Sequence, residues 1–104
     1  MKPLLVFTTF NSKEEAFRLA EKLVEQKLAA CVQVIEGVKS IYFWKGKVER
    51  EEEVLVIAKT TSDRYKELEA FVFNSHPYDV PEIVAVPVEE VLKEYFTWLK
   101  DSLK

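Results

Sequence analysis

Hydrophobic residues recur with two different spacings along the chain, and these spacings predict its secondary structure. Short runs rich in β-branched, aliphatic and aromatic side chains predict strands at residues 4–10, 28–35, 41–44, 48–60 and 82–88. Apolar residues at intervals of three and four predict helices at residues 12–27, 65–75 and 91–103. The resulting order, β-α-β-β-α-β plus a C-terminal helix, predicts an α+β ferredoxin-like fold. Residues 1–104 form a single domain in this interpretation.

Local signals predict where the first helix and the hairpin begin and end. Ser12 and Glu15 have the spacing of a capping box, so the first helix is expected to begin at Ser12. Gly37 predicts a bend or bulge in the following strand. The stretch Lys45-Gly46-Lys47 is typical of a hairpin turn, which joins two strands into a long β-hairpin arm.

The second helix also has boundary signals. Thr61, Ser62 and Asp63 are three overlapping candidates for its N-cap. Pro77 disfavours helical backbone in His76, the residue before it, so this helix is expected to end before His76.

The predicted strands are apolar at consecutive positions instead of alternating with polar residues. A sheet with helices on one face and water on the other should alternate. Residues 4–7, 41–44, 54–58 and 83–86 do not, so both faces of the sheet carry hydrophobic side chains. Self-association is therefore expected to cover the second face, with the arm reaching a neighbour. The alternative is that the C-terminal helix covers it alone.

Composition narrows the classes of partner and location. The net charge of −3 gives no basic surface for nucleic acid or an anionic membrane, so neither partner is expected. One cysteine forms no internal disulfide, and no secretory signal or long apolar segment is evident, which favours a cytoplasmic protein. Charged residues make up 32% of the chain and glycine only two positions, which is typical of heat-stable proteins with many surface ion pairs.

The stretch NSHPYDVPEI at residues 74–83 contains the only histidine, and it has two interpretations. His76 is a candidate metal ligand, because imidazole is the commonest metal-binding side chain. The same residues are typical of a rigid connector between a helix and a strand, and this interpretation is preferred to the metal site. Glu49, Glu51, Glu52 and Glu53 on the arm are interpreted as a solvated acidic run in preference to a cation site. No glycine-rich phosphate loop, zinc motif or hydrolase nucleophile motif is present.

Four short motifs resemble those of the CutA family of divalent-cation-tolerance proteins. They are AACV at 29–32, S-x-Y-x-W-x-G at 40–46, AKTT at 58–61 and HPYDVPEI at 76–83. The resemblance covers essentially the whole chain. It implies a ferredoxin-like subunit in a PII-like homotrimer, located in the bacterial cytoplasm and linked to tolerance of copper and other divalent metals. Members of this family are not known as enzymes.

The resemblance also implies roles for particular residues. Some relatives have two adjacent histidines and a first-strand cysteine that are proposed as copper ligands; here only the second histidine position is filled, by His76. Ser75 takes the first position, and threonines stand where the cysteine would be. The remaining matching positions are expected to line clefts between subunits: Cys31, Tyr42, Trp44, Lys59, Tyr78 and Glu82.

These observations lead to one main functional hypothesis and two alternatives. The main hypothesis is a non-catalytic trimer that responds to divalent metals, with no obligatory cofactor and with copper favoured over zinc at any metal site. The first alternative is a PII-like sensor or adaptor that binds a metabolite or a partner protein at inter-subunit clefts. The second is an enzyme with Cys31 as nucleophile and Lys59 lowering its pKa, for which the sequence shows no evident base.

Overall fold

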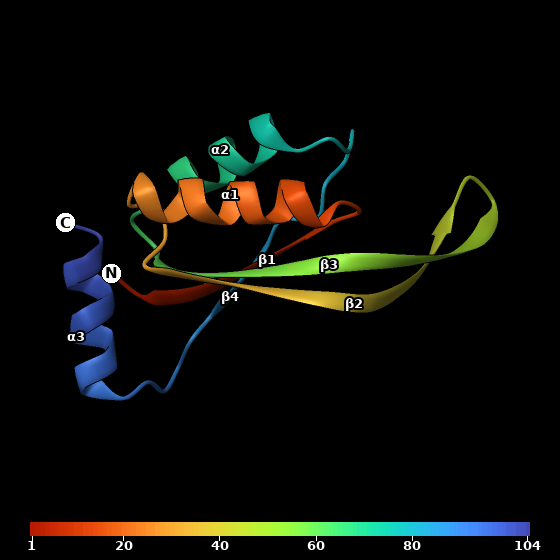
Figure 1. The fold of residues 1–104 in the computed structure, drawn as a ribbon. Helices are drawn as coiled ribbons and strands as arrows, with labels where there is room; N and C mark the ends of the chain where they lie inside the picture. Colours follow the sequence, from red (N-terminus) through yellow and green to blue (C-terminus); the bar gives the residue numbers. More distant parts are fainter.

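The computed structural model describes all 104 residues as a four-stranded antiparallel sheet with two helices on one face (Figure 1). The elements are β1 (Pro3–Phe10), α1 (Lys13–Glu25), β2 (Cys31–Trp44), β3 (Lys47–Thr61), α2 (Tyr65–Ser75), β4 (Val84–Pro87) and α3 (Lys93–Ser102). The strand order across the sheet is β2-β3-β1-β4. This arrangement confirms the predicted α+β ferredoxin-like fold with a C-terminal helix.

Helix α1 begins as predicted but is followed by a strand that starts later than expected. The Ser12 side chain caps the helix by accepting a hydrogen bond from the Glu15 N–H at 3.3 Å. At the other end, the N–H groups of Leu28 and Ala29 both donate to the Leu23 carbonyl oxygen. These two residues therefore close the helix and enter the core, and β2 begins only at Cys31.

The predicted side-chain cap of α2 is wrong. The N-cap position is Arg64, and no side chain caps the helix there. Ser62 is used elsewhere: its N–H donates to the Lys2 carbonyl oxygen, and its hydroxyl accepts from the Lys2 N–H at 2.9 Å. The residues from Thr61 to Asp63 therefore extend the contact between the first and third strands before the helix starts. The end of α2 is as predicted, with His76 at the C-cap.

The hydrophobic core lies between the two helices and one face of the sheet. Val56 of β3 and Leu68 of α2 are fully buried, and Phe10 of β1 is 1% exposed. In antiparallel pairs, residues directly opposite one another point to the same face. Val6 opposite Ala58, and Thr8 opposite Val56, therefore define the face that the helices cover.

The long arm forms because β2 and β3 continue past the end of β1. Strand β1 pairs with β3 only between Val54 and Thr61, whereas β2 and β3 stay paired to the turn at Lys45 and Gly46. Both turn residues have positive φ, 49° and 78°, which is the hairpin geometry that matches strand twist. Gly37, with φ 80°, lies where the pairing register shifts between Ile35 and Val38, which confirms the predicted bulge. The arm projects well beyond the helices (Figure 1).

The opposite face of the sheet is apolar and uncovered. Its members are the side chains on the other side of each pleat, Leu5, Phe7, Ile35, Leu55, Ile57, Val84 and Val86, and this set is called the open face here. Ile35, Val84 and Val86 are 44%, 49% and 44% exposed. The prediction that both faces carry hydrophobic side chains is therefore confirmed.

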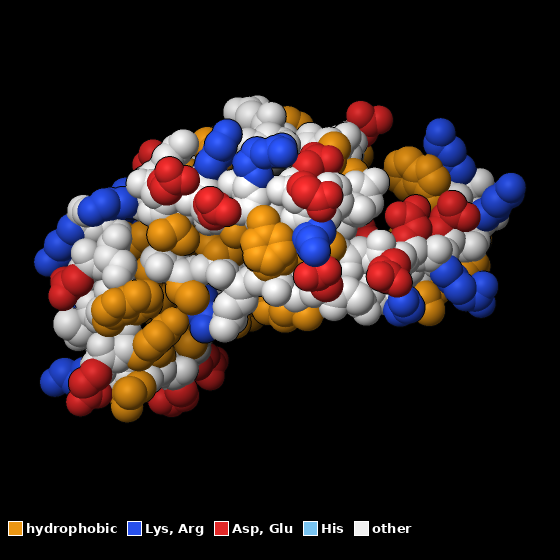
Figure 2. Space-filling view, in the orientation of Figure 1, with side chains coloured by type: hydrophobic (Ala, Val, Ile, Leu, Met, Phe, Trp, Pro, Cys, Tyr) orange, Lys and Arg blue, Asp and Glu red, His pale blue; other side chains and the backbone are white.

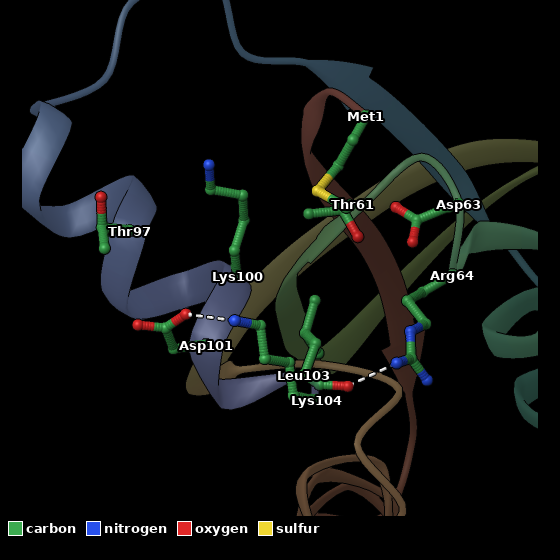
Figure 3. A pocket seen from close by; sticks show the side chains of 9 residues that line it. All are labelled: Met1, Thr61, Asp63, Arg64, Thr97, Lys100, Asp101, Leu103 and Lys104. Carbon is green, nitrogen blue, oxygen red and sulfur yellow. Dashed lines mark hydrogen bonds and ion pairs between the residues drawn. The ribbon is translucent and has the colours of Figure 1, made fainter.

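Helix α3 stands at one end of the sheet and does not cover the open face (Figure 1). Its Leu99 and Leu103 are buried against the end of the sheet. Figure 3 shows the cavity of about 320 Å³ at this junction, lined by residues of α3, the chain start and the segment before α2. Arg64 donates to the Leu103 carbonyl oxygen across it. The alternative that the C-terminal helix alone covers the open face is therefore wrong.

The charged surface forms few ion pairs within the chain. Lys39 pairs with Glu52 at 2.7 Å and Lys104 with Asp101 at 3.1 Å, and both pairs are exposed. Acidic side chains instead gather along the arm, while hydrophobic side chains gather near α3 (Figure 2). The expected wealth of ion pairs is therefore not present within one subunit.

Candidate functional site

The loop that follows α2 is held rigidly by His76. One ring nitrogen, Nδ1, accepts a hydrogen bond from the Tyr78 N–H at 3.2 Å, and Nε2 lies 2.8 Å from the Thr9 carbonyl oxygen. Because Nδ1 accepts, Nε2 carries the proton and donates to Thr9. The ring also stacks on Phe10 with centroids 4.2 Å apart. Burial lowers the pKa of His76 below its usual value, against a smaller opposing effect of the Thr9 hydrogen bond.

Tyr78 joins this loop to the base of the arm. Its hydroxyl donates to Glu53 Oε2 at 2.9 Å, and Glu53 is only 7% exposed. Burial raises the pKa of Tyr78 well above its usual value, and the hydrogen bond to Glu53 adds to the rise. The phenol therefore stays protonated and acts as a permanent hydrogen-bond donor to the carboxylate.

An acidic cleft of about 510 Å³ lies between the arm and this loop. The residues that line this acidic cleft are Thr9, Asn11, Tyr42, Trp44, Glu49, Glu51, Glu53, Tyr78, Asp79, Val80 and Glu82. Five of the eleven are carboxylates, three are aromatic, and none is lysine, arginine or histidine. The cleft is therefore negative and partly apolar, a combination suited to cations.

The negative charge of the acidic cleft affects the pKa of a second tyrosine, Tyr42. The pKa of Tyr42 is raised to about 12, first by its hydrogen bond to Glu51 and then by burial and by the charges of Glu51, Glu53 and Glu49. A raised phenol pKa means that negative charge at this position is disfavoured. The side chains therefore create a field that attracts positive charge into the acidic cleft.

The carboxylates of the acidic cleft do not form a ready metal centre. No three histidine, cysteine, aspartate or glutamate side chains anywhere in the chain lie together in a group that could hold a metal ion. The side chains of Glu49, Glu51 and Glu53 follow one another along one side of β3, so their charges are spread along the strand.

The six predicted cleft residues fall into two separate groups within one chain. Tyr42, Trp44, Tyr78 and Glu82 line the acidic cleft, whereas Cys31 and Lys59 lie at the far end of the sheet. Cys31, a free cysteine, is directly opposite Lys59 in the β2–β3 ladder. The Lys59 ammonium lies 5.5 Å from the ring centroid of Tyr95 in α3.

Sequence reasoning missed several lining residues of the acidic cleft. Asn11 belongs to none of the four motifs, and neither Val80, within the motif at 76–83, nor Thr9 was predicted to line a cleft. The glutamates of the arm were predicted to form a solvated run, whereas Glu49, Glu51 and Glu53 line the acidic cleft and Glu53 is buried. Their spacing held a usable signal: Glu49, Glu51 and Glu53 occur at every second position of a strand, which places them on one face.

The fold and the acidic cleft together define a ferredoxin-like subunit with a long acidic arm. The family model described as CutA1 divalent ion tolerance protein matches residues 4–102, so the chain belongs to the CutA1 family. The divalent-cation tolerance protein CutA of Thermus thermophilus is 44% identical over 98 residues, which cover 94% of this chain and 95% of that protein.

Two solved structures support the same assignment. CutA from Xylella fastidiosa superposes with a TM-score of 0.96 at 33% identity, with 100% of both chains covered. The periplasmic divalent cation tolerance protein CutA of Archaeoglobus fulgidus gives a TM-score of 0.94 at 38% identity, covering 98% of this chain and 99% of that one. The family is named for divalent ion tolerance and not for a reaction.

The comparisons leave the cellular location broader than the sequence suggested. None of the helices combines the length and hydrophobicity needed to cross a membrane. The relative from Archaeoglobus fulgidus is described as periplasmic. Membership in the family is therefore compatible with more than one compartment.

Proposed function

We propose that this chain is a non-catalytic cytoplasmic protein that responds to copper and other divalent metals, with the acidic cleft as the place where cations bind. The observation that supports this best is the set of five carboxylates that line the cleft with no positively charged side chain among them. Such a site attracts cations electrostatically, and this attraction weakens as the ionic strength rises.

The active form is proposed to be a homotrimer. The open face presents a continuous apolar surface that a monomer would leave in water, and the sheet has two unpaired edges, at β2 and β4. Cys31 and Lys59 are distant from the acidic cleft in one chain. All six predicted residues can therefore line one cleft only if two subunits contribute to it. In the proposed trimer, one subunit supplies Cys31 and Lys59, and its neighbour supplies Tyr42, Trp44, Tyr78 and Glu82.

The ligand role of His76 remains a prediction, and the geometry sets its conditions. A metal ion needs a free lone pair on a ring nitrogen, and here Nδ1 accepts from Tyr78 while Nε2 donates to Thr9. Coordination would break at least one of these hydrogen bonds. Binding through His76 is therefore expected to be weak, with copper ahead of zinc and the other divalent metals.

Calorimetric titration with copper tests this proposal on three proteins, the wild type, His76→Ala and the double variant Glu51→Gln/Glu82→Gln. We expect weak binding at pH 7.5 that falls at pH 5.5, because protons compete for the imidazole. Loss of binding in His76→Ala supports the histidine as a ligand. Loss only in the double variant places the metal on the carboxylates, and binding that survives in both variants contradicts the proposal.

A small-molecule sensor is the second candidate function, and one specific observation favours it. The acidic cleft holds about 510 Å³, and no three metal-ligating side chains converge in it. Its size is that of a small-molecule pocket and far exceeds the space of a single ion. A ligand bound there would contact both the arm and the loop of residues 76–82, so it could report its presence through the arm.

A further inference from the structure

Two threonine hydroxyls are buried without a hydrogen-bond partner from the chain, and their surroundings differ. Thr8 and Thr61 are 2% and 1% exposed, and neither Oγ1 atom bonds to another group of the chain. Thr8 lies opposite Val56, on the face that the helices cover. Thr61 instead lines the cavity of about 320 Å³ beside α3. Because a buried hydroxyl without a partner is costly, Thr61 has a hydrogen bond to offer to a molecule in that cavity.

Positive charge without an ion-pair partner lines the same cavity, which is called the junction cavity here. Its charged side chains are Asp63, Arg64, Lys100, Asp101 and Lys104. Lys104 is paired with Asp101 at 3.1 Å, whereas Arg64 and Lys100 form no ion pair. The Arg64 guanidinium donates only to the Leu103 carbonyl oxygen, so most of its N–H groups are free. The junction cavity therefore offers charged N–H donors beside a free hydroxyl, the groups that bind oxyanions.

These donors come from three elements that meet at the junction cavity. Thr61 is the last residue of β3, Arg64 is the N-cap of α2, and Lys100 belongs to α3. In Figure 3 the Thr61 hydroxyl and the Arg64 side chain both point toward Leu103. The Thr61 hydroxyl lowers the pKa of the nearby Asp63 carboxyl, yet it forms no hydrogen bond with that carboxylate. It is therefore available as a donor to a ligand.

From these contacts we propose that the junction cavity binds a small oxyanion, a phosphate group or a carboxylate. The Thr61 hydroxyl and the Arg64 guanidinium donate hydrogen bonds to its oxygen atoms, and the Lys100 ammonium adds positive charge. The Asp63 carboxylate opposes the anion, so the affinity is modest. The junction cavity shares no lining residue with the acidic cleft or with the open face. The site therefore goes beyond the proposed function and lies outside the surface proposed for contact between copies of the chain.

The test is titration of the full-length protein with inorganic phosphate and, separately, with succinate, at pH 7.5 and constant ionic strength. The melting temperature reports binding, because a ligand of the folded state stabilises it. Backbone amide NMR shifts report its place. We expect a saturable response to at least one of the two anions, with the largest shifts around Thr61 and Arg64, and the two arms distinguish phosphate from carboxylate. No saturable response to either anion would overturn the proposal.

Thr61→Val is the main variant, because valine keeps the shape of threonine and removes only the hydroxyl. It should raise the melting temperature of the ligand-free protein and weaken anion binding by about tenfold, the effect of one hydrogen bond to a charged group. The matched control is Thr8→Val, which removes an equally buried hydroxyl outside the junction cavity. It should raise the melting temperature in the same way and leave the anion affinity unchanged. Equal losses of affinity in the two variants would overturn the proposal.

Charge variants test the sign of the ligand. Arg64→Gln should lose binding, whereas Asp63→Asn should bind the anion more tightly because the opposing charge is gone. Weaker binding by Asp63→Asn would contradict an oxyanion site. If Arg64→Gln loosens α3 through its lost bond to Leu103, Thr61→Val still decides the question. Copper binding by these variants should equal that of the wild type, since the acidic cleft is unchanged, so this site and the metal response are tested separately.

Discussion

Both faces of the sheet carry hydrophobic side chains, but helices cover only one of them. On one side of β3, Val54, Val56 and Ala58 are 8%, 0% and 2% exposed because α1 and α2 pack on them. On the other side, Leu55 and Ile57 are only partly buried, and Val86 at the β4 edge is 44% exposed. The first face is a packed hydrophobic core. The second face has similarly hydrophobic side chains, but no element of the same chain packs on it. The difference supports the proposal that another copy of the chain covers the second face.

Truncation of a residue in the core between the helices and the sheet should lower the stability of the protein most. Leu68 of α2 is fully buried, so Leu68→Ala should lower the free energy of unfolding by roughly 3–5 kcal/mol, through lost burial and the cavity left behind. Urea unfolding at several protein concentrations measures this. The loss should be the same at each concentration, since the contact lies within one subunit; a strong dependence on concentration would argue against it.

Trp44 on the arm sharpens the comparison, because it is 51% exposed in one chain. If the arm packs on a neighbour, Trp44→Ala should cost roughly 3 kcal/mol. The loss should depend on protein concentration, because the lost contact lies between chains. Thermal melts at low and high concentration provide the measurement. Unchanged melting and an unchanged oligomer would show that the ring stays exposed in the assembly.

An isosteric polar substitution tests the open face with a matched control. Val86 on the open face and Val24 on α1 are each 44% exposed in one chain. If only the open face is covered in the assembly, Val86→Thr should destabilise the protein by roughly 1–3 kcal/mol, because it buries a hydroxyl, whereas Val24→Thr should be close to neutral. Equal effects in both variants would remove the distinction between the two surfaces.

The smallest effect concerns the pH dependence that His76 contributes. Burial lowers the pKa of His76 below 6.5 in the folded chain, so the unfolded chain binds the proton more readily. The folded state should therefore lose stability as the pH falls through about 6.5. Denaturant unfolding between pH 8 and 5 should show a flatter curve for His76→Gln than for the wild type. Parallel curves would mean that the histidine is not held neutral by the fold.

The sequence predicted the order of elements well because each signal was local. Ser12 and the turn at Lys45 and Gly46 depend on neighbours in the chain, and both are confirmed. The α2 cap was wrong because Ser62 binds Lys2, a partner that no local pattern reveals.

The acidic cleft was harder to predict for the same reason. It brings together β1, the arm and the loop of residues 76–82, so residues such as Thr9 are recognised only when the strands are paired. The grouping of Cys31 with Lys59, away from the cleft, likewise follows from sheet register alone.

Sedimentation equilibrium of the wild-type protein at micromolar concentration tests the central claim most directly. If the open face is completed by other copies of the chain, the measured mass should be about three times that of one chain, and it should stay so on dilution, as expected for a large apolar interface. A stable monomer at micromolar concentration would contradict the account, because the open face would then remain in water.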